Sequence, residues 1–123
     1  MVEFAIVANI LFVMVLTCME FARMNTIRNL AQDAAYFAAR HVIVPGAQES
    51  EAVAEAERIM NAVISHGYTI NVSPLDSSTE EVTVTVSVDF DQVALFAPMF
   101  MPNATIASTV RMKTERYTGF YEQ

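Results

Sequence analysis

The sequence has 123 residues, of which 54% are apolar, and its formal net charge is −7. This length accommodates one domain. The acidic balance argues against a nucleic-acid partner, because phosphate binding needs clustered Lys and Arg, and against adhesion to anionic lipid through charge alone. The single cysteine, Cys18, excludes an intramolecular disulfide.

The first 22 residues are the most apolar part of the chain, and their only charges are Glu3 and Glu20. As a helix, the uncharged run from Phe4 to Met19 would be about 24 Å long, and the flanking apolar residues bring it close to the ~30 Å of a bilayer interior. A cleaved secretory signal would need a basic start and an Ala-x-Ala exit, which are absent. A domain this small cannot bury such a run as a core helix. We therefore interpret residues 1–22 as an anchor and assembly segment.

The helix is expected to continue to about residue 43, because residues 23–43 contain neither Gly nor Pro and Pro45-Gly46 then ends it. This second half is amphipathic and should pack on a small head, so that residues 23–123 form one α+β unit. Its predicted apolar stripe consists of Met24, Ile27, Ala31, Ala34, Ala35, Ala38 and Val42.

A second helix is predicted over residues 49–66, with Ser50 as N-cap and Gly67 as its C-terminal stop. Its apolar face would consist of Ala52, Ala56, Ile59, Met60 and Val63. His41 and His66 would each lie near a helix C-terminus, where the dipole favours a cation. The two histidines are far apart in the sequence and have no Cys nearby, so they offer no zinc pattern.

Three strands should follow. Residues 68–73 alternate polar and apolar, and residues 82–90 do so most clearly, with Val82, Val84, Val86, Val88 and Phe90 on one face. A third strand, roughly residues 104–115, would turn Ile106, Val110 and Met112 inward. An antiparallel three-stranded sheet with one face covered by the two helices is the expected packing.

The connection over residues 91–102 is too apolar for an ordinary solvated loop. Either its apolar side chains (Val93, Leu95, Phe96 and Phe100) close the core, or they contact another subunit, since contiguous exposed apolar surface usually marks an interface. The same two alternatives hold for Tyr117, Phe120 and Tyr121 in the tail.

No pattern in the sequence predicts catalysis. There is no serine elbow, no glycine-rich phosphate loop and no pair of catalytic carboxylates. Asp89 and Asp91 would lie on the solvent face of a strand, where carboxylates are usually only solvated. We predict that the chain is not an enzyme and needs no cofactor or metal.

The opening Val2-Glu-Phe-Ala-Ile-Val-Ala8, the apolar run and then Met19-Glu-Phe-Ala-Arg23 resemble the TadE-like family of pilins and minor pilins of tight-adherence pili. The Ala-rich helix ending at Val44-Pro-Gly-Ala47 extends the resemblance to residues 2–47. Where the family has a proline, this sequence has Asn9, so no helix break is expected there. The family acid is usually the fifth mature residue, whereas Glu3 is the third residue here.

The resemblance implies a structural subunit that is processed by a prepilin peptidase, held in the inner membrane, and then assembled into an extracellular, type IV-like filament used in adhesion. Its implied partners are copies of itself, other pilins and the inner-membrane assembly machinery. Two alternatives stay open: a membrane-anchored assembly or adaptor protein (or minor pseudopilin) that does not polymerise, and a small secreted binding domain with an uncleaved anchor.

Arg23 and Arg28 follow the apolar run and no basic residue precedes it. By the positive-inside rule this charge pattern would keep the head in the cytoplasm. For an external head we expect the chain as made to carry basic residues before Met1 that are later removed.

Glu3 is the residue expected to matter most for assembly. The resemblance gives it the role of the acid near the mature N-terminus, pairing with an α-amine of its own or a neighbouring subunit. The simpler alternative is an acid favoured by the helix dipole at the level of the lipid headgroups. The other predicted assembly residues are Phe4, Ile6, Val7, Ile10, Leu11, Val13, Met14 and Phe21.

Overall fold

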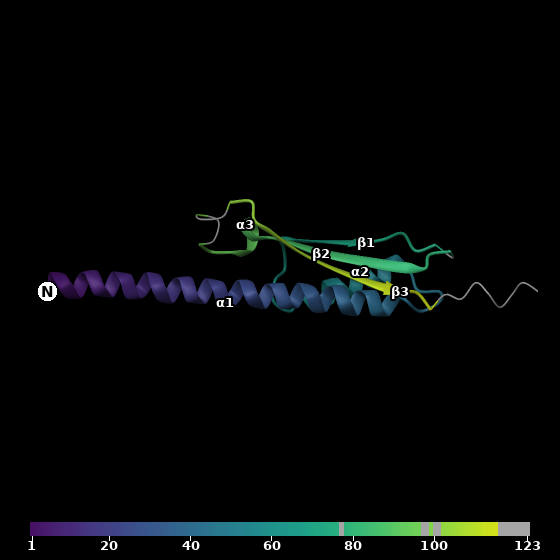
Figure 1. Ribbon diagram of the computed structural model, residues 1–123, viewed down its shortest axis with the longest axis horizontal. Helices are drawn as coiled ribbons and strands as arrows, with labels where there is room; N and C mark the ends of the chain where they lie inside the picture. The colour runs from purple at the N-terminus through teal and green to yellow at the C-terminus, as the bar shows by residue number, and fades with distance from the viewer. Residues whose placement is uncertain (77, 97–98, 100–101, 116–123) are drawn as a thin grey trace, which may run out of the picture.

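The computed structural model describes residues 1–76, 78–96, 99 and 102–115. Its elements are, in chain order, α1 (Val2–Val42), α2 (Glu49–Met60), β1 (Tyr68–Val72), β2 (Glu81–Asp89), α3 (Phe90–Val93) and β3 (Thr105–Lys113). The strands form one antiparallel sheet in the order β1-β2-β3, and α1 and α2 pack against it (Figure 1). The predicted α+β fold, with a long N-terminal helix, a second helix and a three-stranded antiparallel sheet, is confirmed.

Helix α1 is unbroken over 41 residues, or about 62 Å at the ordinary helical rise. It runs through Asn9 without interruption, as expected from the absence of a proline there. Its N-terminal half extends beyond the head, while its C-terminal half lies under the sheet (Figure 1). The first buried residue of α1 is Glu20. Contact with the head therefore begins just before the end of the segment predicted to be the anchor, residues 1–22.

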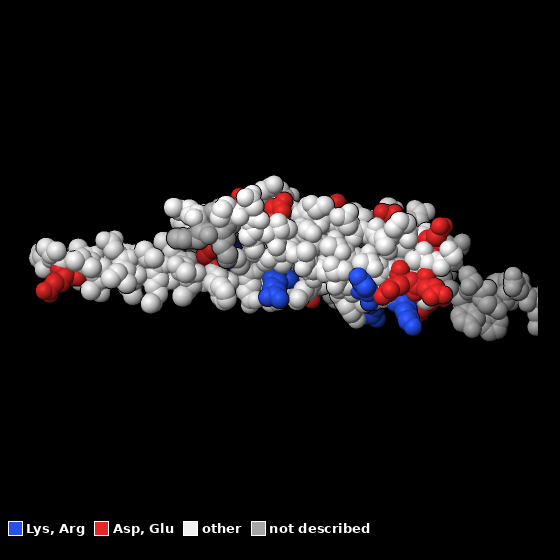
Figure 2. Space-filling model, turned by 45° about the horizontal axis from the view of Figure 1, so that its top comes forward, with Lys and Arg blue, Asp and Glu red and all other residues white. Residues whose placement is uncertain are grey.

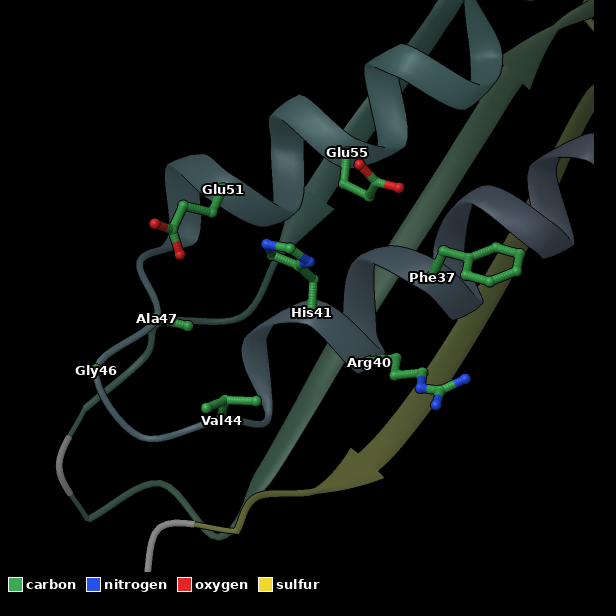
Figure 3. Close-up of a pocket in the computed structure, with 8 residues that line it drawn as sticks. All are labelled: Phe37, Arg40, His41, Val44, Gly46, Ala47, Glu51 and Glu55. Carbon is green, nitrogen blue, oxygen red and sulfur yellow. The ribbon is translucent and has the colours of Figure 1, made fainter.

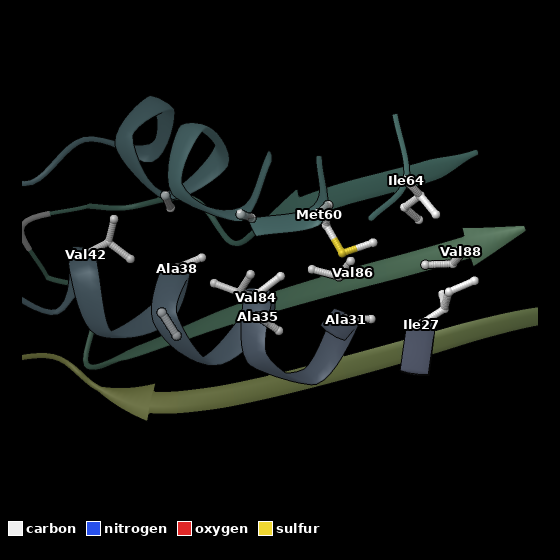
Figure 4. Close-up of a cluster of buried hydrophobic side chains, with 14 of the residues drawn as sticks. Ile27, Ala31, Ala35, Ala38, Val42, Met60, Ile64, Val84, Val86 and Val88 are labelled. Carbon is white, nitrogen blue, oxygen red and sulfur yellow. The ribbon is translucent and has the colours of Figure 1, made fainter. Parts of the chain in front are cut away.

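The packed half of α1 meets the sheet through small side chains. Ala31, Ala35 and Ala38 are fully buried against the valines of β2 (Figure 4). Because alanine leaves little between the helix backbone and its neighbour, α1 can lie close to both β2 and α2. Val84, Val86 and Val88 face this stripe from β2, where period-two alternation turns them all to one side.

Helix α2 is shorter than predicted. It begins after Gln48, not Ser50, because the Glu51 carboxylate accepts a hydrogen bond from the Gln48 backbone N–H at 3.2 Å. It ends at Met60, and the turn that follows carries Ile64 into the core while Val63 stays half exposed.

The predictions for Gly67 and His66 were therefore wrong, since neither residue lies at a helix end. Gly67 instead has φ +82°, and an added Cβ would lie 2.9 Å from the side chains of Gln92 and Val93. A left-handed backbone and a close approach both require glycine at this bend.

Strand β2 ends earlier than its apolar alternation suggested. Phe90 is buried as expected, but it begins the short helix α3, so it does not belong to the strand. Asp91 likewise lies on α3 and not on a strand face, and its carboxylate accepts a hydrogen bond from the backbone N–H of Asn103 at 3.2 Å. The alternation of polar and apolar residues does not predict this change from strand to helix, because a buried Phe is equally compatible with both.

The two methionines Met60 and Met99 provide a matched test of the core. Met60 is fully buried and Met99 is 80% exposed. Met60→Ala should lower the free energy of unfolding by about 2–5 kcal/mol, because it leaves a cavity between α2 and the sheet. Met99→Ala should change it by less than about 0.5 kcal/mol. Urea unfolding of the full chain in detergent, followed by circular dichroism, measures both; equal effects would contradict the packing described.

Candidate assembly surface

The N-terminal half of α1 presents an uncovered apolar surface. Every apolar residue predicted to act in assembly is more than half exposed, and Glu3 is exposed in the first helical turn. Figure 2 shows this half as an uncharged rod with acidic atoms at its N-terminal end. The structure therefore leaves all nine predicted assembly residues exposed on α1. Eight lie on its projecting part and Phe21 lies beside the head: Glu3, Phe4, Ile6, Val7, Ile10, Leu11, Val13, Met14 and Phe21.

By length and composition, α1 contains one segment able to cross a membrane, and none of that segment is buried within the chain. The polar side chain of Thr17 is compatible with such surroundings, because its hydroxyl donates to the Val13 carbonyl oxygen at 2.7 Å. The rod from Val2 to Met19 is about 27 Å long, slightly less than the ~30 Å of a bilayer interior.

Glu20 lies at the junction between this rod and the head. Its role there was not predicted from the sequence. The residue is only 8% exposed. Its Oε1 atom accepts hydrogen bonds from the backbone N–H groups of Leu95 at 2.9 Å and Phe96 at 3.3 Å. Nothing near Glu20 in the sequence predicts this contact, because Leu95 and Phe96 lie 75 and 76 residues further along the chain.

The connection between β2 and β3 divides the predicted contact residues. Val93 is buried and closes the core, whereas Leu95 and Phe96 are 66% and 43% exposed and do not. Their exposure agrees with the alternative that they contact something outside the chain. Four further predicted contact residues lie outside the described residues: Phe100, Tyr117, Phe120 and Tyr121.

A hollow of about 410 Å³ lies beside the junction, between α1 and the start of β3. Phe21, Met24 and Arg28 line it from α1, and Phe90 and Ile106 line it from the sheet side. Phe21 is strongly exposed here, so the apolar surface of the rod continues into this hollow.

A second groove, of about 530 Å³, separates the end of α1 from α2 (Figure 3). His41 extends from α1 toward α2, between Glu51 and Glu55. The hydrogen bond from Arg58 lowers the pKa of the Glu55 carboxyl below its ordinary value. Phe37 lines the same groove and is about half exposed.

The Phe37 ring meets that of Tyr36 edge to face, with centroids 5.6 Å apart. Tyr36 is also about half exposed. This aromatic pair was not among the predicted contact residues, although both rings lie on α1 outside the buried stripe.

Among the residues that the structure describes, no group of three or more His, Cys, Asp or Glu could hold a metal ion. Asp89 and Asp91 are engaged locally: Asp89 accepts a hydrogen bond from the Thr105 hydroxyl at 3.2 Å, and Asp91 holds Asn103. They fix the two ends of the α3 connection.

These features define a class of protein in which a long, projecting apolar helix carries a small α+β head. Residues 1–40 match the family model described as TadE-like protein, which confirms the resemblance over the rod and most of the packed half of α1. The match covers about the first third of the chain. No curated protein and no solved structure matches the chain.

Proposed function

We propose that the chain is a structural subunit of an extracellular tight-adherence pilus. In this proposal it is anchored in the inner membrane before assembly and polymerises through the N-terminal half of α1. Its role is structural and not catalytic. The observation that carries the proposal is the fully helical, uncovered apolar rod of residues 2–19.

An apolar cylinder of this kind needs a covering, because exposing it to water forfeits the free energy of apolar burial along its whole length. A bilayer supplies the covering before assembly, and neighbouring copies of α1 supply it in a filament. The head would then lie outside the bundled helices, where its acidic surface keeps the filament soluble.

The TadE-like match supports the partners of this proposal: other copies of the chain, further pilins and the inner-membrane assembly machinery. A prepilin peptidase would process the precursor, and the assembled filament would serve adhesion at the cell surface. The alternative is a membrane-anchored adaptor or minor pseudopilin. It is favoured by one observation: the rod is long and apolar enough to serve as an anchor without any polymer.

Cys18 provides a direct test of burial in the filament. It is the sole cysteine, lies in the apolar rod and is exposed in the single chain. We expect a charged maleimide to label Cys18 poorly in intact filaments and fully after dissociation in denaturant, because the reagent and the reactive thiolate both need water.

The matched control is Cys18→Ser combined with Asn71→Cys, which places the thiol on an exposed position of β1. That variant should be labelled equally well before and after dissociation. Full labelling of Cys18 in intact filaments would contradict burial of the rod.

A further inference from the structure

The connection between β2 and β3 carries three exposed apolar side chains close to the end of the rod. We define Leu95, Phe96 and Met99 as the junction patch; they are 66%, 43% and 80% exposed. Their position along α1 is fixed, because the Glu20 carboxylate binds the backbone of Leu95 and Phe96. Glu20 follows directly on Met19, the last residue of the uncharged run.

Several backbone N–H groups of this segment form hydrogen bonds within the chain, so they do not depend on water. The N–H of Ala94 donates to the Phe90 carbonyl at 2.8 Å, and that of Met99 donates to the Phe96 carbonyl at 3.1 Å. Those of Leu95 and Phe96 donate to Glu20. Each of these four N–H groups therefore has a partner within the chain, which lowers the cost of bringing this part of the backbone near lipid.

The level of the patch also matches a bilayer surface. The rod of residues 2–19 spans about 27 Å, so its end falls close to the boundary between acyl chains and headgroups of a ~30 Å core. Phe21, 74% exposed, lies at the same level on α1. Arg23, exposed on the next turn, lies where a guanidinium reaches lipid phosphates.

We propose that the junction patch inserts into the outer boundary of the bilayer while the subunit is membrane-anchored, with phospholipid acyl chains as its occupant. Glu20 is the positioning residue that holds the patch at this level. The patch adds apolar surface at the end of the rod, which by itself is slightly shorter than the bilayer interior. It also holds the head at a fixed height over the membrane surface. This inference rests on the membrane stage of the proposed function.

The chain contains no tryptophan, so a single introduced Trp reports its own surroundings. The test uses the full chain in phosphatidylcholine vesicles that contain lipid brominated either near the headgroup or near the chain end. Met99→Trp should show blue-shifted emission that is quenched mainly by bromine near the headgroup. Leu11→Trp, in the middle of the rod, should be quenched mainly by bromine near the chain end. Asn71→Trp, exposed on β1, should be quenched by neither.

If Leu11→Trp is quenched and Met99→Trp is not, the junction patch does not enter the membrane and the inference is overturned while the anchor stands. If Leu11→Trp is itself unquenched, the membrane stage of the proposed function is overturned, and this inference with it. If Met99→Trp becomes shielded only when the ratio of protein to lipid is raised, a second copy of the chain occupies the patch, and the lipid assignment is wrong.

The role of Glu20 is tested by adding Glu20→Ala to Met99→Trp and to Leu11→Trp. Loss of the acceptor should weaken the quenching of Met99→Trp by bromine near the headgroup and leave the quenching of Leu11→Trp unchanged. Unchanged quenching of both would overturn the assignment of Glu20 as the positioning residue.

Discussion

A chain that lacks residues 1–18 is expected to be a soluble, folded monomer. Burial in α1 begins at Glu20, and the hydrophobic core begins at Ile27, so the deletion removes no buried side chain. It does remove most of the exposed apolar surface that would drive association. Circular dichroism and sedimentation of the fragment measure the outcome. An aggregated or unfolded product would show that the rod belongs to the core of the head.

The matched control is a deletion of residues 1–22, the whole segment predicted as the anchor. It also removes Glu20 and so deprives the N–H groups of Leu95 and Phe96 of their carboxylate partner. Its free energy of unfolding should be lower than that of the first fragment by about 1–3 kcal/mol, the usual penalty for an unsatisfied polar group. Equal urea midpoints for the two fragments would show that the Glu20 contact contributes nothing to the head.

Glu3→Gln should leave membrane insertion intact and make filaments few or absent. The substitution keeps the size of the side chain and its helix propensity but removes the charge. A carboxylate at the edge of an apolar rod is costly by several kcal/mol unless it is paired, and this account gives it the α-amine of the mature N-terminus, in the same or a neighbouring subunit, as its partner. An incoming subunit that docks in the correct register would pair the Glu3 carboxylate with the α-amine. The neutral glutamine side chain in the variant would not favour that register.

The comparison variant is Glu49→Gln, which neutralises an exposed acid in the first turn of α2. It should assemble as the unmodified chain does. Carbonate extraction of membranes measures insertion, and the yield of sheared filaments measures assembly. Normal filament yield from Glu3→Gln would reduce Glu3 to an acid favoured by the helix dipole at the headgroups.

The elements that sequence predicted well are those whose signal is periodic and local. The Ala-rich stripe of α1 and the alternating valines of β2 each repeat at one period over several turns or residue pairs. The four valines are buried as expected, and so is every residue of the stripe except Met24, which is only partly buried. The ends of elements were less predictable. Helix α2 stops at Met60 although the apolar spacing continues to Val63. Asn61 is its C-cap, and the Asn61 side chain accepts a hydrogen bond from the Tyr68 hydroxyl at 2.8 Å.

The junction could not be predicted, for a different reason. In the sequence, Glu20 is a charged residue at the edge of an apolar run, and either lipid headgroups or protein could surround it. Only the return of the chain after β2 brings Leu95 and Phe96 to it. The exposed surface of the rod was predictable, because a small domain has too little interior to cover it.

Immunogold electron microscopy of filaments sheared from cells that produce this chain tests the central claim most directly. With antibodies raised against the head, the account predicts gold along the whole length of the filaments, because every subunit projects its head outward from a bundle of α1 helices. Filaments that remain unlabelled, with gold confined to the cell envelope, would contradict it and establish the chain as an anchored adaptor.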